Sequence, residues 1–335
     1  MMRRYPPASI GLLAFTLPFA GCAVNPVIIQ QTGGSAALFH QFALYDAPSG
    51  SPMTFDDLTR RAADSDVILW GEEHSDVVCN GLEAQSLAAF SQQLRPITLA
   101  MEFFENDTQE ALDAYLSHRI NEEEFRKQAR QKKAYLTAHR PLIEYCREFG
   151  IPVVAANAQM RVTRALRLSG KTFDEFRATT QPADRVLLPP SSELLEGPYR
   201  ERFAKAMETH EQPTSQPTTQ SATALGNATS APTTQPSPAE QVLRSYRAQS
   251  LWDDTMARSV ATQRDRHPER RVMLIVGSFH IEREGGTQVK LRRLRPADRV
   301  LIIVYHGKTD TPLKFDEADR DSGDVVIYGL KPPEK

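Results

Sequence analysis

The sequence predicts an α/β fold: a mainly parallel β-sheet flanked by helices on both faces, with a long disordered insertion. Short, mostly apolar runs are typical of strands that are buried on both sides. They occur at 66–71, 96–104, 151–158, 270–280 and 299–306. Longer segments with helical periodicity separate most of them, at 80–94, 108–130, 141–149 and 240–264. Strands that alternate with helices in this way form parallel sheets covered on both faces.

The elements follow one another in a consistent order. The first strand, "DVILWG", is a short apolar run with β-branched residues. The later strands have the same character and read "PITLAMEFF", "IPVVAANA", "RRVMLIVGSFH" and "RVLIIVYH". Residues 160–210 indicate further helices, which are interrupted at Pro189-Pro190 because proline breaks a helix interior.

The N-terminus predicts export. Residues 1–21 have the basic start and short apolar run of a signal peptide, and the run is too short to span a bilayer stably. The stretch Phe19-Ala20-Gly21-Cys22 resembles a bacterial lipobox, although Phe19 stands where leucine is usual. We expect Cys22 to be lipidated and the protein to be tethered in the cell envelope, at the outer membrane and facing the periplasm. The alternatives are an ordinary secreted protein or a weak membrane anchor.

Two further segments are predicted to lie outside the folded core. Residues 22–50 lack helix or strand periodicity and are interpreted as a tether. Residues from about 211 to 240 repeat Pro-Thr-Thr-Gln and contain no aromatic residue. Such a segment buries too little apolar surface to offset its ordering entropy, so it predicts a disordered insertion. Residues 51–335 are then a single domain that this insertion interrupts.

Composition excludes some classes of function. The chain has 40 basic and 42 acidic residues, so it has no strong positive field with which to bind nucleic acid. Cys79 and Cys146 could pair in an oxidising compartment, but sequence cannot show whether their backbones approach closely enough. Cys-x-x-Cys zinc sites are absent from the sequence.

Polar residues follow several of the predicted strands. Glu72, Glu73 and His74 come directly after Gly71, and the next strands end near Glu102, Asn157 and His280. The carboxyl ends of parallel strands share one edge of the sheet, where ligands bind. We therefore expect these side chains to converge. Each one alone has a structural explanation, such as a helix N-terminus for the glutamates or an arginine partner for Glu102.

The residue types at this edge suit two kinds of chemistry. Two imidazoles with one or two carboxylates can hold a divalent metal, with His74, Glu102 and His280 as ligands. The same groups can act as general acid and base. The helix after the insertion adds a heptad-spaced stripe that is apolar at its ends and polar at Gln249 and Asp253. These two residues either border the cleft or face solvent.

Five stretches resemble ChaN-type haem-binding uptake lipoproteins of the wider Tiki, TraB and erythromycin-esterase-like superfamily. They are "DVILWGEEHSD", "AMEFFENDTQEALDAYL", "RPLIEYCREFGIPVVAANAQ", "AQSLWDDTMARSVA" and "VGSFHIEREGG". The resemblance covers about 55–305 except for the insertion. Its most specific signals are Gly71 to His74, Gly277 to His280 and Glu102.

The resemblance implies haem binding first, with a tyrosine ligand and a homodimer that encloses the cofactor. Tyr135, with His139 close by, is the first candidate ligand, and Tyr246 and Tyr199 are alternatives. The further cofactor-binding candidates are Gln249, Asp253 and Asn157.

Other superfamily members imply a metal-dependent hydrolase, a peptidase or an esterase. Their motif maps to Glu72, His74, Glu102 and His280. A third possibility is a tethered binding protein without a cofactor, in which this cluster only ties the edge of the sheet together.

Overall fold

The computed structural model describes residues 42–210 and 236–331. The predicted signal peptide, Cys22, most of the predicted tether and most of the predicted insertion lie outside these residues. Within the described ranges, no helix combines the length and the apolar character that crossing a bilayer requires.

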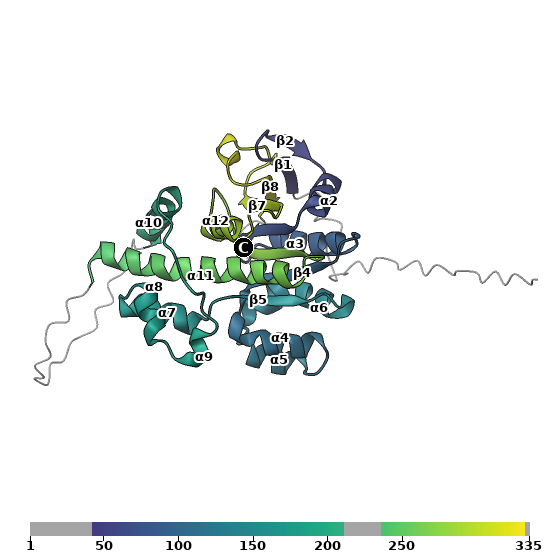
Figure 1. The fold of residues 1–335 in the computed structure, drawn as a ribbon. Coiled ribbons are helices and arrows are strands. Elements are labelled where there is room, and N and C mark those ends of the chain that lie inside the picture. The colour runs from purple at the N-terminus through teal and green to yellow at the C-terminus, as the bar shows by residue number, and fades with distance from the viewer. Residues whose placement is uncertain (1–41, 211–235, 332–335) are drawn as a thin grey trace, which may run out of the picture. The chain divides into compact units, whose positions relative to one another are not determined.

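The described residues form one eight-stranded sheet in the order β2-β1-β8-β7-β3-β6-β4-β5 (Figure 1). From β8 to β5, each strand pairs in parallel with its neighbour. The two remaining pairs, β8 with β1 and β1 with β2, are antiparallel. This confirms the predicted fold class. The strands are β1 Phe42–Asp46, β2 Ser51–Met53, β3 Val67–Glu72, β4 Ile97–Glu105, β5 Val153–Asn157, β6 Arg271–Gly277, β7 Val300–Lys308 and β8 Val325–Leu330.

Helices connect most of the strands. They are α2 Phe55–Asp64, α3 Val77–Ser91, α4 Gln109–Leu116, α5 Glu122–Gln128, α6 Arg140–Phe149, α7 Met160–Ser169, α8 Phe173–Thr179, α9 Pro182–Arg185, α10 Pro198–His210, α11 Pro238–Arg266 and α12 Gly286–Leu294. Two short segments matter for the site: the π-helical turn Tyr135–His139 and the 3₁₀ turn Ser278–His280.

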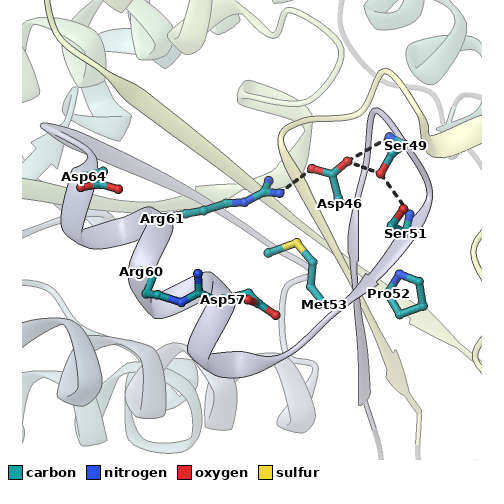
Figure 2. Close-up of a pocket in the computed structure, with 9 residues that line it drawn as sticks. All are labelled: Asp46, Ser49, Ser51, Pro52, Met53, Asp57, Arg60, Arg61 and Asp64. Atoms are coloured by element: carbon teal, nitrogen blue, oxygen red, sulfur yellow. Dashed lines mark hydrogen bonds and ion pairs between the residues drawn. The ribbon is translucent and has the colours of Figure 1, made fainter.

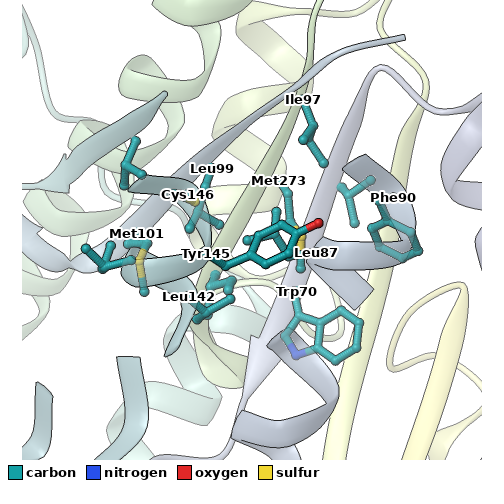
Figure 3. Packing of buried hydrophobic residues seen from close by; sticks show 14 of the residues in the cluster. Trp70, Leu87, Phe90, Ile97, Leu99, Met101, Leu142, Tyr145, Cys146 and Met273 are labelled. Atoms are coloured by element: carbon teal, nitrogen blue, oxygen red, sulfur yellow. The ribbon is translucent and has the colours of Figure 1, made fainter. Parts of the chain in front are cut away.

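Apolar side chains on the two faces of the sheet meet different helices. On one face, Trp70 and Met273 pack with residues of α3 and α6, such as Phe90 and Leu142 (Figure 3). On the other face, the alternate strand residues pack against α11 and α12. Both faces of the sheet are therefore shielded from solvent, which explains why the strand sequences are almost continuously apolar.

The element boundaries differ from the sequence expectations in three places. Residues 42–50, within the predicted tether, form β1 and the turn to β2, because β1 pairs with β8 from the C-terminal end of the chain. The predicted helix 108–130 is two helices, since Asn121 caps a new helix with its side chain. Helix α11 starts at Pro238, inside the predicted insertion.

The two cysteines that could have paired do not form a disulfide in this structure. Cys79 and Cys146 are both buried free thiols.

The strand order places the polar strand ends together. β6 lies between β3 and β4 in the sheet, and all three are parallel. Their carboxyl ends are consecutive at one edge. Gly71 permits the close approach of the chain after β6, because a Cβ at this position would lie 2.8 Å from Ser278 Oγ and 3.0 Å from Ser278 Cα.

Candidate functional site

The imidazole of His74 contacts a buried carboxylate. Glu72 ends β3 and is only 3% exposed. His74 Nδ1 lies 2.7 Å from Glu72 Oε1, while 62% of the His74 side chain is exposed. His139, from the π-helical turn, places Nε2 3.4 Å from Glu72 Oε2. One carboxylate therefore holds two imidazoles, one at the surface and one buried.

The charge on Glu72 orients the His74 ring. Burial opposes ionisation of Glu72, but hydrogen bonds and positive charge from His139 and His74 outweigh burial and lower its pKa. An ionised carboxylate only accepts hydrogen bonds, so the Nδ1 that faces it carries the hydrogen. Neutral His74 then keeps its lone pair on Nε2. The hydrogen bond to Glu72 also raises the pKa of His74.

A second carboxyl group, Glu83 on α3, lies next to Glu72. Glu83 is fully buried, and Cys79 Sγ lies 3.5 Å from its Oε1. Burial and the neighbouring charge of Glu72 raise the pKa of Glu83 well above its usual value. Two adjacent buried carboxyl groups do not both ionise. We therefore assign the negative charge to Glu72 and the proton to Glu83.

Phe103 bridges the two imidazoles. Its ring stacks on His139 with centroids 3.7 Å apart and meets the His74 ring edge-on at 5.6 Å. Gln131 Nε2 donates to the carbonyl oxygen of Phe103 at 3.1 Å. The segment 131–139 is therefore attached to Phe103 at both of its ends, and the surroundings of His74 are partly aromatic.

A second histidine–carboxylate pair lies after β6. His280 Nδ1 lies 2.6 Å from Asp253 Oδ1, and Asp253, on α11, is fully buried. Asp253 also accepts hydrogen bonds from Thr287 Oγ1 at 2.8 Å and Tyr199 Oη at 2.7 Å. Gln249 Nε2 donates to Tyr199 Oη at 3.1 Å. The polar middle of the α11 stripe therefore borders the site and does not face solvent.

The charge balance around His280 favours the imidazolium. Burial alone would lower the pKa of His280, but the carboxylates of Asp253 and Glu102 outweigh it and raise the pKa to about 9. His280 Nε2 lies 3.6 Å from Glu102 Oε1. The imidazolium is thus held between two carboxylates.

Glu102 connects the two histidine–carboxylate pairs. Its Oε2 accepts a hydrogen bond from the Gly277 backbone N–H at 2.7 Å. A Cβ at Gly277 would lie 3.4 Å from His74 Nε2 and 3.6 Å from Glu102 Oε2. The glycine at position 277 therefore lets the His74 imidazole and the Glu102 carboxylate pack closely against the backbone that follows β6.

The structure thus brings Glu72, His74, Glu102 and His280 together at the carboxyl edge of the sheet. Three other predicted residues make different contacts. Tyr135 is 1% exposed and packs among Phe104 and Phe125. Tyr246 donates to the Leu195 carbonyl oxygen at 2.6 Å. Asn157 accepts from the backbone N–H of Ala158. The roles assigned to all these residues stay predictions.

Sequence reasoning missed three contributors to this cluster: Phe103, Glu83 and Thr287. Phe103 directly follows Glu102, so its place at the strand end was available as a signal. Glu83 lies on the helix after His74, where a glutamate ordinarily faces solvent. Nothing in the sequence indicates that Thr287 would meet Asp253.

Other features of the described residues lie outside this cluster. A cavity of about 490 Å³ beside β1, β2 and α2 is lined by residues such as Asp46 and Arg61, which form an ion pair (Figure 2). A second cavity of about 390 Å³ touches Tyr199. No group of three or more His, Cys, Asp or Glu side chains within residues 42–210 and 236–331 is arranged to hold a metal ion.

Comparison with solved structures gives a match to a structure described as cofacial haem binding to ChaN of Campylobacter jejuni. It has a TM-score of 0.59 and 14% identity, and covers 88% of this chain and 98% of that chain. The type III effector HopBA1 matches at a TM-score of 0.44 and 14% identity, covering 83% of this chain and 93% of that chain. Erythromycin esterase EreC matches at a TM-score of 0.42 and 11% identity, covering 82% of this chain and 79% of that chain. At these identities the matches show the fold alone.

Comparison with curated proteins finds no match. The family described as "Haem-binding uptake, Tiki superfamily, ChaN" matches residues 58–291. These residues span the strands β3, β4 and β6 with both histidine–carboxylate pairs. The chain belongs to this ChaN family of the Tiki superfamily.

Proposed function

We propose that the chain is a lipid-anchored protein of the cell envelope that binds haem and takes part in haem or iron uptake. The observation that carries the proposal is the family match across residues 58–291. The site suits such a ligand. An exposed imidazole and an adjacent aromatic ring offer an iron ligand and an apolar contact.

Titration of the purified full chain with ferric haem tests the binding. We expect a saturable visible spectrum that differs from that of free haem, because a protein ligand changes the coordination of the iron. Size-exclusion chromatography of the same samples tests the homodimer, which we expect to form or to become tighter with haem. A titration that never saturates, with a spectrum that remains that of free haem, would refute haem binding.

The anchor is tested separately. Cys22→Ala is expected to release the protein from membrane fractions and to change its mature mass, since the lipid would be attached to that cysteine. Membrane fractionation and mass spectrometry measure both effects. A variant that stays in the membrane with an unchanged mass would contradict lipidation at Cys22 and leave haem binding untouched.

A second candidate function is hydrolysis, as a peptidase or esterase. It is favoured by the two histidine–carboxylate pairs on either side of Glu102, with His280 Nε2 3.6 Å from Glu102 Oε1. In such an enzyme Glu102, His74 and His280 would move protons or hold a divalent metal, and Glu72 and Asp253 would orient the rings. One bound divalent metal per chain, lost on replacing either histidine, would favour this function over haem binding.

A further inference from the structure

We propose that the carboxyl edge of the sheet docks on the surface of a membrane that contains anionic phospholipids. The surface involved, here called the docking patch, consists of Val77, Lys132, Lys133 and Leu136. The inference rests on the proposed lipid anchor and goes beyond it, because it states which side of the folded protein faces the bilayer. It assigns no ligand to the buried carboxylates below the patch.

The described chain begins at the same edge of the sheet as the docking patch. β1 starts at Phe42 and runs antiparallel to β8, so Phe42 pairs with Gly329 at the carboxyl end of β8. β8 and β7 lie between β1 and β3, which puts the ends of β1 and β3 at this edge roughly 15 Å apart. Val77 follows β3 at this edge. The chain therefore enters the fold on the side of the patch.

The segment between the proposed lipid and β1 limits how far this edge can be from the bilayer. Residues 23–41 separate Cys22 from Phe42, and a chain of that length spans at most roughly 65 Å. The amino edge of the sheet lies about one strand length, roughly 20 Å, farther from this attachment point. A lipid at Cys22 therefore favours the carboxyl edge as the side that meets the membrane.

Two apolar side chains of the patch project into solvent. Val77, the first residue of α3, is 57% exposed, and Leu136, in the π-helical turn, is 40% exposed. The π-helical turn lies beside the end of β3, because its last residue, His139, contacts Glu72. Exposed apolar side chains next to cations are typical of protein surfaces that enter the boundary between headgroups and acyl chains.

The two lysines of the patch have no acidic partner among the described residues. Lys132 and Lys133 are both exposed, and neither forms an ion pair within residues 42–210 and 236–331. The acidic residues at the neighbouring strand end are neutralised elsewhere, since Glu105 and Asp107 both pair with Arg130. An unpaired lysine near an anionic bilayer strengthens binding about fivefold, so an anionic surface complements the patch.

The docking patch gives only weak binding without the lipid. Two lysines and two apolar contacts bury far less surface than an inserted helix, so their contact with a membrane is reversible. Cys22→Ala is therefore still expected to leave the membrane fraction. In the lipid-anchored protein the patch sets the orientation, because the anchor holds it close to the bilayer and raises its effective concentration there.

The test measures vesicle binding by the purified chain from residue 23 onward, which carries no lipid and contains every described strand and helix. The vesicles contain phosphatidylcholine alone or phosphatidylcholine with phosphatidylglycerol. The parent chain is compared with Leu136→Glu, with the double variant Lys132→Glu/Lys133→Glu and with a control, Leu94→Glu. Leu94 is also fully exposed, but it lies between α3 and β4 at the amino edge. All the substituted side chains are exposed, so folding should be retained, which circular dichroism checks.

We expect the parent chain to bind the anionic vesicles at least about tenfold more tightly than the neutral ones, and to lose this preference at high salt. The double lysine variant should lose most of the preference. Leu136→Glu should bind anionic vesicles more than about fivefold more weakly, because it replaces an apolar contact with a negative charge. Leu94→Glu, with the same change in charge, should bind like the parent chain.

The lipid-anchored full chain gives an independent measurement of orientation. A fluorophore is attached to Leu136→Cys or to Leu94→Cys, and labelling is selective because Cys79 and Cys146 are buried. On anionic vesicles, the label at position 136 should be shielded from a water-soluble quencher, and the label at position 94 should not. Equal quenching of the two labels would contradict the proposed orientation.

The outcomes separate the docking patch from the proposed function. Equal binding to neutral and anionic vesicles, or equal losses in Leu136→Glu and Leu94→Glu, would overturn the patch. It would also be overturned if Leu136→Glu bound vesicles normally but no longer formed a haem-linked dimer, which would identify a contact between two copies of the chain. A mature protein whose mass shows no lipid would overturn the proposed anchor without changing the vesicle result.

Discussion

Arg271→Leu is expected to destabilise the protein by more than about 3 kcal/mol, because it leaves several buried acceptors without a donor. Arg271 begins β6 and is fully buried. Its Nη2 donates to the carbonyl oxygens of Phe90 at 2.6 Å and Arg95 at 2.8 Å. Its Nη1 donates to Ala62 O at 3.1 Å and to the Gln93 side chain. One guanidinium thus joins the ends of α2 and α3 to the sheet.

Arg271 stays positively charged although it is buried. Burial lowers the pKa of Arg271 to about 10, so the group is still protonated at neutral pH. Arg271→Lys should therefore destabilise the protein almost as much as Arg271→Leu, since an ammonium group cannot reproduce the planar guanidinium that spans these acceptors.

Urea denaturation of Arg271→Leu and of Arg299→Ala compares the loss of unfolding free energy that each substitution causes. Arg299 is 63% exposed and pairs with Asp66, so its loss should cost less than about 1 kcal/mol. A cost below about 1 kcal/mol for Arg271→Leu would contradict this account of how the helices are attached.

Asp253→Ala should have the second large effect, about 3–5 kcal/mol of destabilisation, because it removes the nearer of the two carboxylates that hold a buried imidazolium. It also removes the acceptor for Tyr199 and Thr287, whose hydroxyl groups both donate to Asp253. Thr287→Val removes only one of these hydrogen bonds and serves as the control, with an expected cost of about 1 kcal/mol. Equal costs for the two variants would show that the charge pair contributes little.

The pH dependence isolates the charge pair. The pKa of His280 is raised to about 9, so its contribution to stability is fully present below about pH 6.5 and is lost as the pH rises through about 9. The shift corresponds to about 3 kcal/mol. Asp253→Asn should remove most of this pH dependence of the unfolding free energy. An unchanged slope between pH 6.5 and 9 in Asp253→Asn would contradict the assignment.

The sequence predicted the core of the fold and the general location of the candidate site. The continuous apolar strands and the residues that follow them are local signals, and the convergence of Glu72, Glu102 and His280 follows from the parallel arrangement. The strands β1, β2 and β8, which lie next to one another on one side of the sheet, were not predicted, for a physical reason. β1 and β2 are five and three residues long, and the pairing of β1 with β8 joins opposite ends of the chain.

The finer contacts of the site depend on tertiary packing and could not be predicted. The polar interruption in the α11 stripe indicated that Gln249 and Asp253 were unusual, but not that Asp253 would hold His280. Tyr135 precedes the stretch "LTAHRPL" and lies near His139 in the sequence, which made it the first candidate ligand. In the fold its ring turns into a cluster of aromatic side chains, while His139 turns toward Glu72.

One measurement tests the central claim, that this edge of the sheet serves haem binding, most directly. The wild-type protein is purified from cells supplied with haem, and its haem and divalent metal contents are determined on the same sample. We predict a haem content that approaches one per chain and divalent metal far below one per chain. One divalent metal per chain without haem would contradict the account and favour the hydrolase.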